Sequence, residues 1–327
     1  MRNPFEPMSF DEMRCLAPSI FAETPHESRS DRYAYIPTIE VVTAMMKEGF
    51  LPFSVMQARS RSESRREYTK HLIRFRHAEM LKANPHAGQL FPEIVLVNSH
   101  DGSSAYQVMS GIFRLVCTNG MITGTHYGDY KIRHQGDIAG QVIDASYKVL
   151  TTAEQSLNAA GEWSGIRLTE PEQIALARAA HAVRFADAEG NISTPITPEQ
   201  LLRPRRMEDW KDDLWSTFNR VQENTLKGGL SAFSYEGGRR RRVTSRKIGG
   251  ITEDVRINRA LWMLGEEMKK AQDRLKVRGR PLKGGPSTQL WTYGVKPMNG
   301  KLLLYMDQFG NHFYARSVKE LRQQIGM

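Results

Sequence analysis

The spacing of apolar residues changes period twice between residues 36 and 155. The order of elements that these changes predict constrains the fold more than any single motif. Apolar residues recur at helical spacing from 37 to 46, alternate with polar residues in several segments from 50 to 117, and return to helical spacing from Asp137 onward. A helix, several strands and a long helix therefore predict an α+β fold with a mixed or antiparallel sheet and long helices.

The segment His71–His77 shows the two-residue period most clearly. One predicted face carries Leu72, Arg74 and Arg76. The other carries His71, Ile73, Phe75 and His77. The apolar run at residues 93–98 is rich in β-branched residues and predicts a buried strand.

The second half of the chain is predicted to be mainly helical. Thr169 and Glu172 form a capping box at the start of one helix. A helix is expected at Met207–Lys227, and Thr252 is expected to cap a last long helix. Three tryptophans are interpreted as helix-packing residues rather than as platforms for bases: Trp210, Trp215 and Trp262.

These patterns divide the chain into three predicted parts. Residues 1–160 form an α+β core with a basic strand region. Residues 161–277 form a helical region that carries an arginine-rich ribbon at 237–250. Residues 278–327 follow a linker rich in Gly, Pro and Lys, and form a small C-terminal module with a β-hairpin and a helix.

Positive charge is concentrated in two segments. The formal net charge is +10, from 46 Lys and Arg residues against 36 Asp and Glu residues. Residues 201–280 hold 20 basic and 11 acidic side chains, and residues 56–82 hold 8 and 3. Such a local excess attracts polyanions, so nucleic acid is the favoured partner. An acidic protein partner, or acidic surfaces of this chain that cover the two segments, are the open alternatives.

The ribbon segment is the sharpest feature of the sequence. Four consecutive arginines lie between paired glycines, and an extended backbone would place successive arginines on opposite faces. Guanidinium groups pair with phosphate oxygens and stack on bases. We therefore expect nucleic-acid binding at Arg239, Arg240, Arg241, Arg242, Arg246 and Lys247. A solvated hairpin edge is the structural alternative.

Arg74 and Arg76 are predicted to form a second surface for anionic ligands, because they share one face of a strand. Four more arginines precede this strand: Arg59, Arg61, Arg65 and Arg66. The same phosphate chemistry applies here, so Arg74 and Arg76 are also expected to bind nucleic acid.

Composition and motifs exclude several classes of protein. Cys15 and Cys117 are too few for a disulfide framework or a thiolate zinc site, which indicates a reducing cytoplasm. No apolar stretch reaches the roughly 18 residues of a membrane helix. Acidic residues near the N-terminus argue against an export signal. Without a P-loop, dinucleotide fingerprint, H-E-x-x-H or EF-hand motif, we expect no cofactor and no metal.

A hydrolase is left open by two weaker patterns. Ser99, His100 and Asp101 are neighbours in sequence, but catalytic triads assemble from distant positions, and Asp101-Gly102 predicts a turn. A metal-dependent nuclease would use His71, His77, Asp101 and His134. Six residues along a strand separate the first two histidines, so we do not favour an enzyme.

Five strings occur in an order that resembles domain-of-unknown-function family 932, a family of plasmid and prophage proteins of the YafZ, YfjQ and YubP types. The strings are RYAYIPT, TKHLIRFRH, PEIVLVNSHDGSSAYQVMSGIFRLVCTNG, RPRRMEDWKDDLWSTFNRVQENTLKGGL and INRALWMLGEE. The resemblance implies a mobile element and the bacterial cytoplasm, and it implies no activity. The order of a helix, an arginine-lined sheet and a long helix also looks like the core of single-strand annealing proteins of the Rad52 and phage Beta type.

The sequence therefore predicts a DNA-binding accessory protein of a plasmid or phage that acts on single strands, with annealing as one such activity. A protein-interaction factor that blocks a host defence system is the alternative, and a metal-dependent nuclease is the second alternative. Self-association into a homo-oligomer is left open.

Overall fold

The computed structural model describes residues 3, 5–27, 35–60, 62, 64–81, 90–115, 119–124, 128–134, 136–236 and 239–275, and three short strands beyond residue 290. The chain divides into two compact units, Met1–Gly265 and Glu266–Met327. The division predicted at residue 160 falls inside a helix of the first unit, which contains both the α+β core and most of the helical region.

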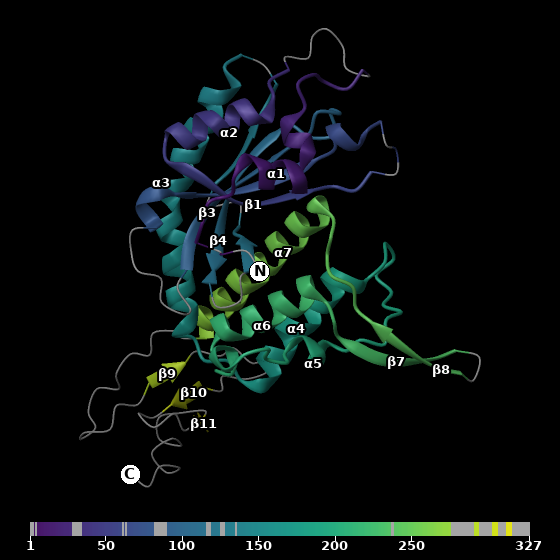
Figure 1. Cartoon of the computed structure of the whole chain (residues 1–327). Helices are drawn as coiled ribbons and strands as arrows, with labels where there is room; N and C mark the ends of the chain where they lie inside the picture. The colour runs from purple at the N-terminus through teal and green to yellow at the C-terminus, as the bar shows by residue number, and fades with distance from the viewer. Residues whose placement is uncertain are drawn as a thin grey trace. The chain divides into compact units, whose positions relative to one another are not determined.

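Six strands form one sheet in the first unit (Figure 1). The strands β1 to β4 are neighbours in chain order, and β4 then pairs with both β5 and β6 along different halves of its length. Every pair is antiparallel, which confirms the α+β class. The strands are β1 (Phe50–Gln57), β2 (His71–His77), β3 (Leu90–Asn98), β4 (Tyr106–Arg114), β5 (Asn119–Ile122) and β6 (Asp129–Ile132).

Helices α2 (Thr38–Lys47) and α3 (Ile138–Ser164) cover one face of this sheet (Figure 1). Their apolar stripes close a core to which β2 contributes Ile73 and Phe75. The start of α3 is fixed by Asp137, whose side chain accepts a hydrogen bond of 2.9 Å from the Gly140 N–H.

Helix α7 (Ile251–Leu275) packs on the opposite face of the sheet. Ile251 and Val255 meet an apolar cluster that includes Leu72 of β2. Because Leu72 lies on this face and Ile73 on the other, the alternation predicted for β2 is confirmed. An ion pair of 2.9 Å from Arg259 to Asp129 joins α7 to β6.

Helices α4 (Glu170–Phe185), α5 (Pro198–Leu201) and α6 (Leu214–Lys227) also belong to the first unit. The rings of Trp163 and Trp262 lie 4.8 Å apart in an aromatic cluster beside α6. Trp215 and Trp262 are buried there, so their predicted packing role is confirmed. Trp210 is 64% exposed, and its predicted place in the core is wrong.

The helix predicted at Met207–Lys227 is interrupted. A single 3-10 turn, η6 (Met207–Asp209), precedes α6, which begins only at Leu214. The side chain of Asp213 accepts a hydrogen bond of 2.7 Å from the Ser216 N–H and acts as the N-cap. The capping preference of aspartate therefore overrides the apolar period in this segment.

The other predictions of where helices begin are confirmed in part. The capping box of Thr169 and Glu172 is confirmed, and a short helix, α1 (Phe10–Leu16), lies near the N-terminus. By contrast, α7 begins one residue before Thr252, whose hydroxyl accepts a hydrogen bond from Lys70 instead of capping the helix.

In the second unit, β9 (Trp291–Tyr293), β10 (Leu303–Met306) and β11 (His312–Ala315) form a three-stranded antiparallel sheet. This confirms the predicted β-rich C-terminal module. The predicted linker at 279–286 and the final helix lie outside the described residues. None of the helices in the described part of the chain is long and apolar enough to span a membrane.

Candidate nucleic-acid interface

Strands β7 (Ser231–Glu236) and β8 (Arg239–Thr244) form a separate two-stranded antiparallel sheet. From here on, the ribbon means these two strands, of which β8 lies in the predicted segment 237–250. The ribbon projects from the helices of the first unit (Figure 1). Arg239–Thr244 are extended, which is the conformation that the two-face arrangement of the arginines requires. Arg246 and Lys247 follow the end of β8 and are exposed.

Backbone hydrogen bonds hold the base of the ribbon. The Gly229 N–H donates to the Ser245 carbonyl at 2.8 Å, and the Ser245 N–H donates to the Leu230 carbonyl at 2.7 Å. Gly228 has a positive φ of 62°, and a Cβ there would lie 2.6 Å from the Arg246 backbone, so only glycine fits. The base is therefore fixed while the strands extend from it.

The register sorts the ribbon side chains into two faces. Phe233 is opposite Arg242 and Tyr235 is opposite Arg240, so these four side chains share one face. The Arg240 guanidinium lies 3.6 Å from the centroid of the Phe233 ring, a cation–π contact across the diagonal pair. Arg239 and Arg241 lie on the opposite face, because side chains alternate along a strand.

Both faces are open to solvent. All four ribbon arginines are exposed, as are Tyr235 at 72% and Phe233 at 46%. Among the side chains that the structure describes, none of the ion pairs engages residues 239–242. The sequence prediction missed the two aromatic residues, although they alternate with Ser and Glu immediately before the arginines.

Arg74 and Arg76 are placed differently, and the prediction that they line a surface is corrected. They are 6% and 2% exposed, and both donate to Glu93, at 3.1 Å from Arg74 and 2.9 Å from Arg76. The Arg76 guanidinium also lies 3.8 Å from the centroid of the Phe113 ring. A phosphate cannot reach either side chain in this arrangement.

The pair of buried arginines instead connects the sheet to its neighbours. Arg74 donates to the carbonyl oxygens of Gly120 and Met121 and lies 3.9 Å from Asp254 of α7. Burial raises the pKa of Asp254, and the Arg74 charge opposes this shift. A Cβ at Gly120 would lie 2.5 Å from the Arg74 guanidinium, so the close contact requires glycine.

His71 of the predicted nuclease set and His100 of the Ser99, His100 and Asp101 trio lie in a buried hydrogen-bond network around Thr38. The Thr38 hydroxyl lies 2.9 Å from His71 Nε2 and 3.0 Å from His100 Nε2, and it accepts from the Asn98 amide at 3.0 Å. His71 Nδ1 also meets the Ser19 hydroxyl at 3.0 Å. Sequence reasoning did not find this network, because Ser19 and Thr38 come from other elements.

Burial lowers the pKa of His71 to about 3 and that of His100 to about 4, and the charge of a neighbouring histidine adds to each shift. Both rings are therefore neutral near pH 7. Hydrogen bonds to Thr38 hold both neutral imidazoles, whereas His100 Nδ1 is buried without a hydrogen-bond partner among the described residues.

The predicted nuclease set comes together only in part. The charges of His100 and Asp101 act on the pKa of His71, and those of His134 and Asp101 act on the pKa of His100, so His71, Asp101 and His134 lie around His100. His77 lies at the opposite end of β2 from His71, beside Phe50, and its Nε2 meets the Glu48 carbonyl. Asp101 accepts a hydrogen bond of 2.9 Å from the Ser103 N–H in a tight turn. Within the described ranges, no group of three or more His, Cys, Asp or Glu side chains could hold a metal ion.

Comparison with known proteins places the chain in a family without an assigned activity. The family described as "Domain of unknown function (DUF932)" matches residues 25–262. UPF0380 protein YfjQ of Escherichia coli (strain K12) is 43% identical over 262 residues, which cover 80% of this chain and 92% of that protein. UPF0380 protein YafZ of the same strain is 42% identical over 262 residues, which again cover 80% of this chain and 92% of that protein.

No solved structure matches the chain, so the likeness to single-strand annealing proteins gains no support. The family resemblance that the five sequence strings carried is confirmed, and the match covers the sheet, the ribbon and most of the helices around them. The chain belongs to the DUF932 family.

Proposed function

We propose that this protein binds nucleic acid through the ribbon, as a DNA-binding accessory protein of a plasmid or phage. The observation that carries the proposal is the exposed face on which Phe233 and Tyr235 lie beside Arg240 and Arg242. Arginine forms charge-assisted contacts with phosphate, and exposed rings stack on bases. The plasmid or phage setting and the bacterial cytoplasm rest only on the family resemblance.

The preferred ligand is a single strand. Bases inside a duplex are covered by their neighbours, whereas unpaired bases present free faces to aromatic side chains. On the ribbon, Tyr235 offers an exposed ring, and Arg240 lies over the Phe233 ring with its own planar guanidinium available for stacking. Arg239 and Arg241 lie on the other face, where they are available to pair with the phosphates of a strand that wraps around the ribbon.

The proposal is tested by fluorescence anisotropy with a labelled oligothymidine strand and a labelled duplex. Replacing both aromatic residues (Phe233→Ala, Tyr235→Ala) is expected to weaken single-strand binding by about 1–3 kcal/mol for each stacked base, and to change duplex binding little. Trp210→Ala is the matched control, because Trp210 is also exposed and lies outside the ribbon.

Absence of binding to either form at low salt would contradict the proposal. The alternative function, interaction with a host defence protein, then becomes testable with the same surface. In a pull-down from nuclease-treated host lysate, a protein that is retained by the natural chain and lost with Arg239→Gln, Arg241→Gln would support this alternative.

A further inference from the structure

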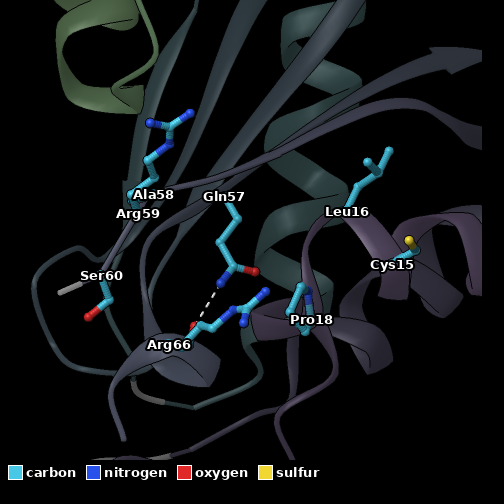
Figure 2. A pocket seen from close by; sticks show the side chains of 8 residues that line it. All are labelled: Cys15, Leu16, Pro18, Gln57, Ala58, Arg59, Ser60 and Arg66. Atoms are coloured by element: carbon cyan, nitrogen blue, oxygen red, sulfur yellow. Dashed lines mark hydrogen bonds between the residues drawn. The ribbon is translucent and has the colours of Figure 1, made fainter. Parts of the chain in front are cut away.

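The pocket between the N-terminal helices and the loop after β1 does not add a phosphate site to the ribbon (Figure 2). Arg59 and Arg66 both line this pocket. In Figure 2, however, the Arg59 guanidinium points away from Arg66 and from the side chain of Gln57. Guanidinium groups that diverge do not hold one phosphate together. The ribbon itself offers a different way to enlarge the surface for nucleic acid.

The outer edge of β7 is open to a further strand. The ribbon is a sheet of two strands, so β7 pairs with β8 along one edge. The Ser245 N–H donates to the Leu230 carbonyl at 2.7 Å, and this bond fixes the alternation of hydrogen bonds along the ribbon. The backbone N–H and carbonyl groups of Phe233 and Tyr235 therefore point away from β8. Among the residues that the structure describes, no hydrogen bond reaches these four groups.

Charge distinguishes the two edges of the ribbon. The β8 strand begins with four consecutive arginines, and two copies of this edge would place like charges opposite each other. The β7 strand has the sequence SAFSYE, without Lys or Arg. The β7 edge is therefore the one that a second copy of the same chain can approach.

The open backbone groups also select the register of such a pair. The Ser231 carbonyl accepts a hydrogen bond of 2.8 Å from the Gln200 side chain, which closes the edge at the base of the ribbon. An antiparallel pair of β7 strands centred on Ser234 uses the groups that remain, because Phe233 of each copy is then opposite Tyr235 of the other. This arrangement has the twofold symmetry that is most common between identical chains.

We propose that two copies of this chain pair through the β7 edge and form a four-stranded sheet with β8 on both outer sides. On one face, Phe233 and Tyr235 of the two copies form a single group of rings, bordered by Arg240 and Arg242 of each copy. The rings stay exposed, because they stand on the face of the sheet and the pairing uses its edge. That this doubled face holds one single strand rests on the function proposed above, whereas the pairing itself does not.

A bound strand is expected to strengthen the pairing. Without a ligand, the arginines of two ribbons repel each other, and the edge offers the backbone groups of only Phe233 and Tyr235. The phosphates of a strand neutralise this charge, and a strand that spans both ribbons stacks on the rings of both copies. A ligand that binds the pair more tightly than the single chain raises the paired fraction.

Disulfide trapping tests the pairing directly. Ser234→Cys places two thiols opposite each other at the symmetry axis, where the Cβ atoms of a non-hydrogen-bonded pair lie about 4.5–5.5 Å apart. Ser231→Cys is the matched control, because Ser231 lies on the same strand and is half-buried, as Ser234 is. The proposed register would keep the two copies of residue 231 about 20 Å apart.

In a glutathione redox buffer, the disulfide between two copies of residue 234 is expected to form at least about tenfold faster than that between two copies of residue 231, because pairing raises the local thiol concentration to about the millimolar range. A short oligothymidine is expected to increase this ratio. Peptide mass mapping separates the linked peptides from those of Cys15 and Cys117. Equal melting temperatures of the reduced variants verify that both fold. In native mass spectrometry, the natural chain is expected to bind the same oligothymidine as two chains on one strand.

The outcomes separate the pairing from the function proposed for the ribbon. Faster linkage at residue 234 in a chain that binds no DNA would support the pairing and reject that function. A chain that binds oligothymidine one to one, with linkage at residue 234 no faster than at residue 231, would keep that function and overturn the pairing. Two chains on one strand without faster linkage at residue 234 would also overturn it, because the copies would then bind side by side without joining their β7 edges.

Discussion

Two strands of this protein, β2 and β8, carry several arginines and use them in opposite ways. On β2, Arg74 and Arg76 are buried and share the carboxylate of Glu93. On β8, the arginines are exposed and have aromatic neighbours rather than a buried acid. The difference is set by the adjacent strand, since β3 brings Glu93 beside β2 whereas β7 brings Phe233 and Tyr235 beside β8.

The comparison shows that an arginine pattern alone does not identify a nucleic-acid surface. A guanidinium removed from water needs a carboxylate and further hydrogen bonds, and it then contributes to the integrity of the fold. A guanidinium kept in water contributes little to the fold and stays available for a ligand. The same residue type therefore predicts a large effect on stability at β2 and a large effect on binding at β8.

The largest effect is expected for Glu93→Gln. This change removes the carboxylate that Arg74 and Arg76 share and leaves two buried charges without it, so the free energy of unfolding should fall by about 3–5 kcal/mol. Arg241→Gln on the ribbon should change it by no more than about 0.5 kcal/mol. Urea unfolding followed by circular dichroism measures the free energy of unfolding of both variants. Equal losses would contradict the difference between β2 and β8.

A glycine pair tests how tightly Arg74 is held. Gly120→Ala places a Cβ against the Arg74 guanidinium, which its ion pair keeps from moving, and should destabilise the protein by about 1–3 kcal/mol. Gly161→Ala in α3 meets nothing within 4 Å and should be neutral or stabilising by up to about 1 kcal/mol. Similar losses from both changes in the same unfolding experiment would mean that Arg74 is not held as described.

The buried histidines His71 and His100 predict a pH dependence. The folded pKa values of His71 and His100, about 3 and about 4, lie below the ordinary value of 6.5. The unfolded chain therefore takes up protons first as the pH falls, and stability is lost below about pH 6.5. Between pH 6.5 and 5.5 the two groups together should lower the free energy of unfolding by about 2 kcal/mol.

Unfolding midpoints measured across this pH window test the histidine prediction. The variant His71→Gln should reduce the pH-dependent part of the loss by about half, whatever its effect at neutral pH. A loss that is the same in the variant and in the natural chain would remove His71 as its source.

Much of the fold was predictable because its elements have clean periods. The alternation in β2 assigned Ile73 and Leu72 to opposite faces, and the structure places them in separate cores. Trp210 shows where prediction from apolar spacing fails. The predicted helix began at Met207, whereas the helix in the structure begins after its N-cap Asp213 and leaves Trp210 outside. Local capping chemistry decided the boundary there.

The candidate site was predicted only in part, because pairing between strands is not visible in one sequence. The ribbon arginines were recognisable as a run, but their aromatic partners depend on the register of β7 and β8. The burial of Arg74 and Arg76 depends on Glu93, an acidic residue in an otherwise apolar strand. An acid within such a strand is a signal that nearby arginines are structural.

The central claim is that the exposed arginines of the ribbon hold nucleic acid and the buried arginines of β2 do not. The most direct test measures the affinity of a labelled oligothymidine across a salt series for the natural chain and for a variant with Arg239, Arg240, Arg241 and Arg242 all replaced by glutamine. Four lost phosphate contacts should reduce the slope of log affinity against log salt by about 3, with an unchanged melting temperature. An unchanged slope and affinity in the folded variant would contradict the account.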